Sequence, residues 1–164
     1  EIFHTRFAPG SSTPDPDPPV IALPGAVGTG VDYAADPAGE HVYLAFGDGA
    51  DVVLTDGAVF GDGPQVTLNG GSGPDFAPVV VATSGGGAVF WFRGMGGSSG
   101  RLHAAPFSYD GAAFTVGNTS TVVTSCSPYY QSAATHVTGN VYFAAWSEGT
   151  SPDFRIKGTF VSLE

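Results

Sequence analysis

The stretch "AVFWFR" (88–93) decides the fold, because the chain contains two counterparts of it, "HVYLAF" (41–46) and "NVYFAAW" (140–146). Each of the three is almost uninterruptedly apolar, with β-branched and aromatic residues. Such runs are typical of strands that are buried on both faces of a sheet. Each stretch also follows a short turn that contains glycine. The three therefore predict three central strands, each the second strand of a hairpin.

The turns before these strands support the hairpins. Glycine adopts a positive φ without steric cost, as tight hairpin turns require. The turns are "PAGE" (37–40), "SGGG" (84–87) and "VTGN" (137–140). The three central strands can be aligned on one valine in each, at spacings of 47 and 52 residues. These valines are Val42, Val89 and Val141.

Three further strand patterns accompany each central strand, which makes a unit of four strands in about 50 residues. The first strands of the units are 20–23, 65–68 and 119–124. The small-residue strands before the turns are 31–36, 78–83 and 131–136. The last strands are 51–55, 101–107 and 154–161.

Four-stranded antiparallel meanders repeated at this length are typical of β-propeller blades. A single meander cannot bury both of its faces, whereas meanders stacked side by side can. We therefore expect an all-β fold of about three blades that does not close on its own. A β-sandwich and a β-solenoid are the alternatives.

The chain also begins with a strand that resembles its own last strand. "IFHTRF" (2–7) matches the fourth strand of the unit, with steps of 50, 50 and 54 residues from Ile2 to Val52, Leu102 and Ile156. This strand is surplus within the chain. The expected divisions are an outer strand that pairs with another chain or blade (1–8), a proline-rich linker (9–19) and three blades (20–60, 61–107 and 108–164).

Three blades are too few to close a ring, since propellers have about four to eight. We expect the first and last blades to expose apolar faces that another chain covers. That chain is a fragment of the same precursor, from which this segment was excised, or a second copy related by twofold symmetry.

The composition excludes several classes of function. Only five residues are Lys or Arg and the net charge is −10, so a phosphate backbone would be repelled and no nucleic acid is expected as a partner. No apolar run approaches 18 residues, so membrane insertion is not expected either. The single cysteine, Cys126, excludes an internal disulfide and is interpreted as a thiol without a role.

Catalytic motifs are weak. "GGSSG" (96–100) places Ser98 in the spacing of a nucleophile elbow, but no helix pattern follows it. Asp48 and Asp51 are candidates for binding calcium, although a solvated turn explains them better. The four histidines are His4, His41, His103 and His136, and their spacing does not indicate a zinc site.

Most acidic residues fall in expected loops and are interpreted as solubilising turn residues, although paired carboxylates of a glycoside hydrolase remain an alternative. They are Asp36, Glu40, Asp56, Asp62, Asp75, Asp110, Glu148 and Asp153.

The aromatic residues supply the only candidate binding site. Trp91 and Trp146 lie in central strands and are expected in the core between blades. Tyr129 and Tyr130 lie in an expected loop beside Cys126 and are the candidates for binding a glycan.

The stretch "PVVVATSGGGAVFWFRG" (78–94) with "GRLHAAPFSYDG" (100–111) is similar to repeats of bacterial extracellular β-propeller proteins. The resemblance is at the level of structure, extends more loosely to 136–164 and 31–60, and carries no catalytic residues. It implies an extracellular or cell-surface location and a role in binding or assembly.

The predicted function is therefore a non-catalytic structural or adhesive module within a larger assembly, with no cofactor. A lectin-like propeller is one alternative, and part of a propeller glycoside hydrolase is another.

Overall fold

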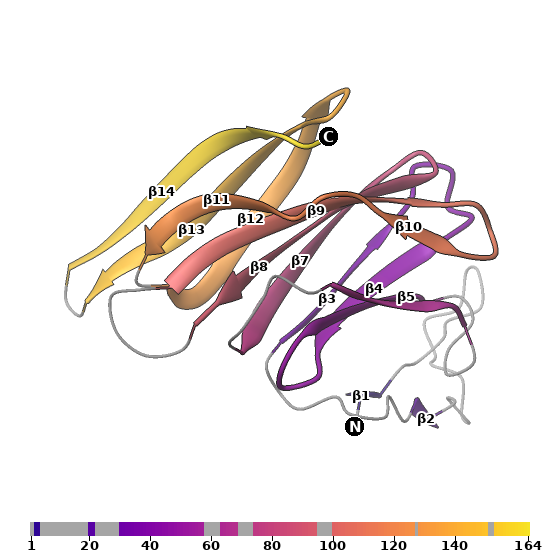
Figure 1. The fold of residues 1–164 in the computed structure, drawn as a ribbon, viewed down its shortest axis with the longest axis horizontal. Helices are drawn as coiled ribbons and strands as arrows, with labels where there is room; N and C mark the ends of the chain where they lie inside the picture. The colour runs from indigo at the N-terminus through magenta and orange to yellow at the C-terminus, as the bar shows by residue number, and fades with distance from the viewer. Residues whose placement is uncertain are drawn as a thin grey trace, which may run out of the picture.

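The computed structural model describes residues 2–3, 20–21, 30–57, 63–68, 74–94, 100–126, 128–150 and 153–164. These residues form antiparallel β-sheets that lie side by side, and none of the sheets closes on itself (Figure 1). The predicted all-β class is confirmed. Within the described ranges no helix is long and apolar enough to cross a bilayer.

The first sheet is a meander of four strands in chain order. It comprises β3 (Val31–Ala35), β4 (Val42–Gly47), β5 (Val52–Asp56) and β6 (Gln65–Leu68). Each strand begins or ends within a few residues of its sequence prediction, because alternating small and bulky apolar residues mark these runs clearly.

The second sheet has five strands. Its path is β7 (Asp75–Thr83), β8 (Gly86–Arg93), β9 (Gly100–Tyr109) and β10 (Phe114–Val116), and β11 (Ser120–Cys126) also pairs with β9. The short strand β10 was not predicted. It pairs with the end of β9 and β11 pairs with its beginning, so together they extend one outer edge.

The third sheet contains β12 (Pro128–Thr138), β13 (Val141–Thr150) and β14 (Asp153–Ser162). A separate two-stranded pair is formed by β1 (Ile2–Phe3) and β2 (Val20–Ile21). The beginning of the chain therefore pairs with another segment of the same chain.

The expected strand order within the units is wrong in one respect. Segment 65–68 does not pair with the strand that follows it; as β6, it pairs with β5, which precedes it. Likewise, β11 pairs with β9 and not with β12. The reason lies at the opposite edge of the sheets. There β7 contacts both β3 and β12, so the edge left for another strand is that of the preceding sheet's last strand.

The three sheets enclose two separate cores. Tyr43, Leu54, Val89 and Trp91 are buried between the first and second sheets. On the other face of the second sheet lies a core with the third sheet, formed by Phe90, Phe92, Tyr142, Ala144, Trp146 and others. Strand β8 is therefore buried on both faces, as its sequence predicted.

The predicted equivalence of Val89 and Val141 is wrong. Val89 points towards the sheet that precedes its own. In β13 the side chains that point towards the preceding sheet are Tyr142 and Trp146, so Val141 points the other way. In a run that is apolar at every position, similarity of residues carries no information about which face each side chain takes.

The predicted hairpin turns are confirmed by their backbone. Gly39, Gly85 and Gly139 have φ angles of 73°, 72° and 55°. One non-glycine residue among those described shares this region: Ala77, with φ 50°, lies at a bulge in β7. A Cβ on Gly30 would lie 2.9 Å from the Cα of Ala77, so β3 and β7 approach closely at this point.

Candidate functional site

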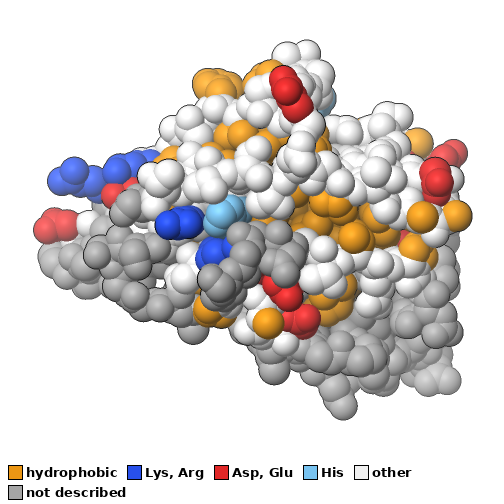
Figure 2. Space-filling view, viewed as in Figure 1, with side chains coloured by type: hydrophobic (Ala, Val, Ile, Leu, Met, Phe, Trp, Pro, Cys, Tyr) orange, Lys and Arg blue, Asp and Glu red, His pale blue; other side chains and the backbone are white. Residues whose placement is uncertain are grey.

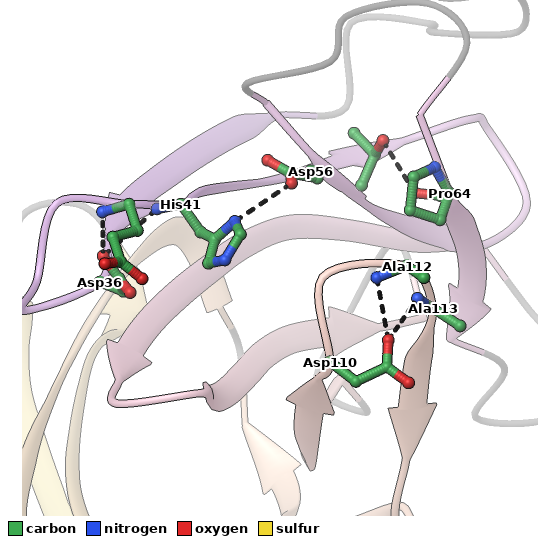
Figure 3. Close-up of polar contacts among 9 residues, drawn as sticks. Asp36, His41, Asp56, Pro64, Asp110, Ala112 and Ala113 are labelled. Atoms are coloured by element: carbon green, nitrogen blue, oxygen red, sulfur yellow. Dashed lines mark hydrogen bonds and ion pairs between the residues drawn. The ribbon is translucent and has the colours of Figure 1, made fainter.

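A cluster of polar side chains lies at one end of the first sheet, against the second (Figure 3). We call it the His41 cluster, and it comprises Asp36, His41, Tyr43, Asp56 and Tyr109. One Asp36 carboxylate oxygen accepts hydrogen bonds from the backbone N–H groups of Glu40 and His41, at 2.8 and 3.3 Å. The His41 Nδ1 lies 3.4 Å from an Asp56 carboxylate oxygen.

Aromatic rings close the cluster from the second sheet. Tyr109 lies edge-on to His41, with 5.0 Å between ring centroids. Burial raises the pKa of Tyr109, and its hydrogen bond to Asp56 raises it further. Burial also raises the pKa of Tyr43, helped by the negative charges of Asp36 and Asp56. Both phenols are therefore protonated at neutral pH, but only the Tyr109 hydroxyl has a hydrogen bond, to Asp56; the Tyr43 hydroxyl is buried without a partner.

The His41 cluster holds an imidazole beside a carboxylate, which is the arrangement that orients a general base. A nucleophile within hydrogen-bond reach of His41 would complete such a site. Two other polar side chains near the cluster contact backbone groups: Thr55 donates to the carbonyl of Pro64, and Asp110 accepts from the N–H groups of Ala112 and Ala113. The contacts fit a polar seam between two sheets better than a catalytic centre.

Three acidic residues expected to be solubilising are in fact buried, which corrects that interpretation. Asp36, Asp56 and Asp75 are 7%, 2% and 0% exposed. Asp75 forms a two-point ion pair with Arg93, its direct neighbour across β7 and β8, at 2.7 and 2.6 Å. A buried carboxylate is tolerated only with such partners, and the sequence alone does not show which acids have them.

The candidate calcium residues form a turn. One Asp48 carboxylate oxygen accepts from the N–H groups of Ala50 and Asp51. Burial raises the pKa of Asp51, and the nearby charges of Asp48 and Asp75 add to this effect. Across the described residues, no three histidine, cysteine or acidic side chains form a group that could hold a metal ion.

His103 is buried beside Trp91 in the second sheet, at 4% exposure, and the two rings stack 5.8 Å apart. Its Nδ1 lies 3.4 Å from the Thr121 hydroxyl, while its Nε2 and the Trp91 Nε1 are buried without a hydrogen-bond partner. Burial lowers the pKa of His103 to about 4, and the charges of Arg93 and Arg101 contribute. This histidine is therefore neutral at physiological pH.

Cys126 is a buried free thiol that donates to the carbonyl of Gly100. Burial raises its pKa to about 11, and the charge of Glu148 contributes. A protonated, buried thiol is a poor nucleophile and a poor metal ligand.

Basic side chains lie mainly in the left half of the view in Figure 2, while acidic ones are scattered over the view. The described basic residues belong to β8, β9 and β14, and two of them have acidic partners. Arg93 pairs with Asp75, and Lys157 lies 2.8 Å from Glu148. The Lys157 hydrogen bond lowers the pKa of Glu148, which also accepts from the Trp146 indole.

The structure places the remaining sequence candidates as follows. Trp91 and Trp146 are buried between sheets, as predicted. Tyr129 and Tyr130 belong to strand β12 and not to a loop, which corrects their expected setting. Their side chains, with Ser98, His4 and Asp62, lie outside the described residues, and the glycan-binding role of the tyrosines stays a prediction.

A groove of about 670 Å³ runs along the inner edges of the three sheets. Small residues such as Gly30 and Ala77 line it, with Asp32, Ser132 and Ser147 as its polar members. One Asp32 oxygen is already occupied by the N–H of Val80, at 2.8 Å. The groove continues to Ile156 in the third sheet, so its wall is mostly apolar.

The third sheet has one face packed on the second sheet and one face turned away from it. We call the latter the open face, formed by Val141, Phe143, Ala145, Ile156 and Phe160. Ile156 and Phe160 are 85% and 68% exposed, and Phe143 and Phe160 lie 5.1 Å apart. Strand pairing places Phe143 opposite Phe160, and Ala145 opposite Gly158. The apolar side chains therefore form one continuous patch.

Sequence reasoning anticipated an exposed face on the last blade but did not name its residues, and it missed the His41 cluster. The residues of the exposed face could not be named, because the pairing register decides which alternate residues of β14 point away from the core. Comparison with known proteins adds no assignment: no family model, curated protein or solved structure matches this chain.

Proposed function

We propose that this chain is an arc of a β-propeller that acts as a non-catalytic assembly module. Its open face is the docking surface, and the partner that covers it is a further sheet of the same kind. The extracellular location and the structural or adhesive role belong to the same proposal and rest on the sequence resemblance.

The observation that carries the proposal is a difference in solvent exposure at corresponding positions of the three sheets. The pairing Gly47–Val52, Phe92–Leu102 and Ser147–Ile156 places these residues at corresponding points of β5, β9 and β14. Val52 and Leu102 are both 0% exposed, because the next sheet covers them. Ile156 is 85% exposed. A further sheet on β14 would give Ile156 the environment that its two counterparts have.

A second correspondence supports the same stacking. Phe46, Trp91 and Trp146 lie one residue before those paired positions, and all three are buried, at 2%, 0% and 6% exposure. Trp91 packs on the first sheet and Trp146 on the second. The second and third sheets thus turn a large aromatic residue to the sheet before them, and the first and second sheets turn a smaller apolar residue to the sheet after them. This one-way stacking suits a radial arrangement.

The inner strands support the radial arrangement as well. Strand β7 contacts β3 on one side and β12 on the other. Small residues line this edge, and bulky ones lie further out, as wedge-shaped packing around an axis requires.

The mass of the native particle tests the proposal. A single chain has a mass of 16.6 kDa, and we expect sedimentation velocity and native mass spectrometry to find a larger species. Phe160→Asp places a charge in the centre of the open face and should return the protein to a monomer. Thr115→Asp, which adds the same charge at the exposed residue of β10, is the control and should leave the assembly intact.

A chain that stays monomeric at all accessible concentrations would contradict the proposal. So would an assembly that both aspartate variants weaken equally, because the association would then depend on net charge and not on the open face.

A further inference from the structure

The outer edge of β14 distinguishes the third sheet from the other two. Outside β5 lies β6, and outside β9 lie β10 and β11. Among the described residues, β14 pairs only with β13, although it is ten residues long. A long free edge of unpaired N–H and C=O groups is a template for another strand.

The charges of β14 do not close this edge. Arg155 and Lys157 are exposed on β14, and charged side chains often protect edge strands. However, β9 carries the exposed Arg101 at the position that corresponds to Arg155, and it still accepts β11 beside it. The same kind of strand therefore fits the edge of β14.

One strand in the chain has only a short described pairing and could fill this edge. Segments 20–23, 65–68 and 119–124 occupy the same place in the predicted four-strand unit, and the last two lie on the outer edges of β5 and β9. The first contains β2, whose only described pairing is a two-residue contact with β1. Among the described residues, one strand of this type thus lacks a long partner, and one long edge lacks a strand.

β2 and β14 lie at opposite ends of the row of sheets (Figure 1). The two cannot meet within one open arc, so the strand must come from another copy. We propose that β2 of one copy pairs antiparallel with the outer edge of β14 of a second copy and replaces β1 there. This inference rests on the proposed function and specifies its partner: a second copy of this chain, joined head to tail.

The two existing sheets predict the register of this pairing independently. Leu54 is opposite Val66 in the first sheet, and Ala104 is opposite Ser120 in the second. Val66 and Ser120 are each the second residue of their segment, as Ile21 is of its own. Gly158 corresponds to Leu54 and Ala104, so it should lie opposite Ile21. Val20 should then lie opposite Thr159.

A head-to-tail arrangement also places the sheets correctly. In the chain, β6 leads directly to β7, which begins the next sheet, and β11 leads to β12 in the same way. If β2 lies on β14 of another copy, the β3 that follows it begins the sheet beyond the third. That sheet would lie over Phe143, Ile156 and Phe160 of the open face.

Disulfide trapping between two single-cysteine proteins tests the inference. Both carry Cys126→Ser, and one carries Val20→Cys while the other carries Thr159→Cys. Directly paired residues on antiparallel strands have Cα atoms about 4.5–5.5 Å apart, within the range of a disulfide. After mixing and mild oxidation, we expect a mixed disulfide dimer of 20 with 159 as the main product.

Arg155→Cys replaces Thr159→Cys in the control. Position 155 lies on the same strand as position 159 but four residues before it, which is about 13 Å at 3.3 Å per residue. We expect several-fold less mixed dimer from this pair.

Equal yields in the two mixtures would mean random collision and would overturn the inference. An assembly that is sensitive to Phe160→Asp but gives no disulfide between positions 20 and 159 would also overturn it, while leaving the proposed function in place. If neither an assembly nor a disulfide is found, both are contradicted.

Discussion

At the scale of single residues, the buried polar side chains of this protein mainly make contacts within and between neighbouring sheets. Asp75 and Arg93 neutralise each other at the beginning of the second sheet. The His41 cluster joins the end of the first sheet to Tyr109 of the second. Buried charges need specific partners, so these contacts hold the sheets in one relative position. None of these contacts presents a reactive group to a described cavity.

His103 gives the stability of the fold a pH dependence. In the folded chain its pKa is lowered to about 4, below the ordinary 6.5. The unfolded chain therefore binds the proton first as the pH falls. Stability from this residue is complete above pH 6.5 and is lost between there and about pH 4, by up to about 3 kcal/mol at 1.36 kcal/mol per pKa unit.

Urea unfolding of His103→Leu at several pH values measures this effect. We expect the variant to lose less stability than the wild type between pH 7 and pH 4. His136→Leu removes a histidine from an exposed hairpin and is the control. An unchanged pH dependence in His103→Leu would show that other groups cause the acid sensitivity.

At the scale of elements, hairpins and close strand approaches determine where glycine is required. Gly139 and Gly85 serve turns with positive φ. Gly87, with φ 157°, has an additional role, because a Cβ there would collide with the backbone carbonyl of Val81 on the neighbouring strand. In the sequence all of these glycines look alike.

Gly87→Ala should therefore destabilise the fold by about 1–3 kcal/mol, since the strands β7 and β8 would have to move apart. Gly85→Asn is the matched variant: nothing lies within 4 Å of a Cβ at Gly85, and asparagine tolerates positive φ. We expect it to cost less than about 1 kcal/mol. Free energies from urea unfolding compare the two, and equal costs would contradict the close-approach argument.

At the scale of the whole molecule, the chain is a row of sheets with an uncovered end. Leu102 and Ile156 occupy corresponding positions, yet only Leu102 is covered by a following sheet. The free energy of unfolding should register this difference at concentrations where the chain is monomeric.

Leu102→Ala should cost about 2–5 kcal/mol, as expected for a buried leucine. Ile156→Ala should change the stability of the monomer by no more than about 0.5 kcal/mol, as expected for a surface position. If Ile156→Ala proves as costly as Leu102→Ala, the chain itself covers the open face, and the assembly proposal loses its basis.

Much of this architecture could be predicted locally. The runs around Phe46, Trp91 and Trp146 specified central strands, because near-continuous runs of β-branched and aromatic residues favour the interior of a sheet. Glycine specified the hairpin turns, because only glycine adopts positive φ without strain. Periodicity and turn chemistry act between neighbours in the chain, so the sequence by itself determined the all-β class, the strand positions and the hairpins.

Only the tertiary structure decided which edge each outer strand joins, which face each side chain takes and which acids are buried. β6 could have joined either of two strands by local pattern alone. Its place was settled by the contact of β7 with β3 and β12, which leaves the edge of β5 free. For the same reason, Asp75 was wrongly expected to be a solubilising residue, and Ile156 was not identified as part of the exposed face. Burial depends on residues far apart in the chain, and a one-residue shift in register reverses it.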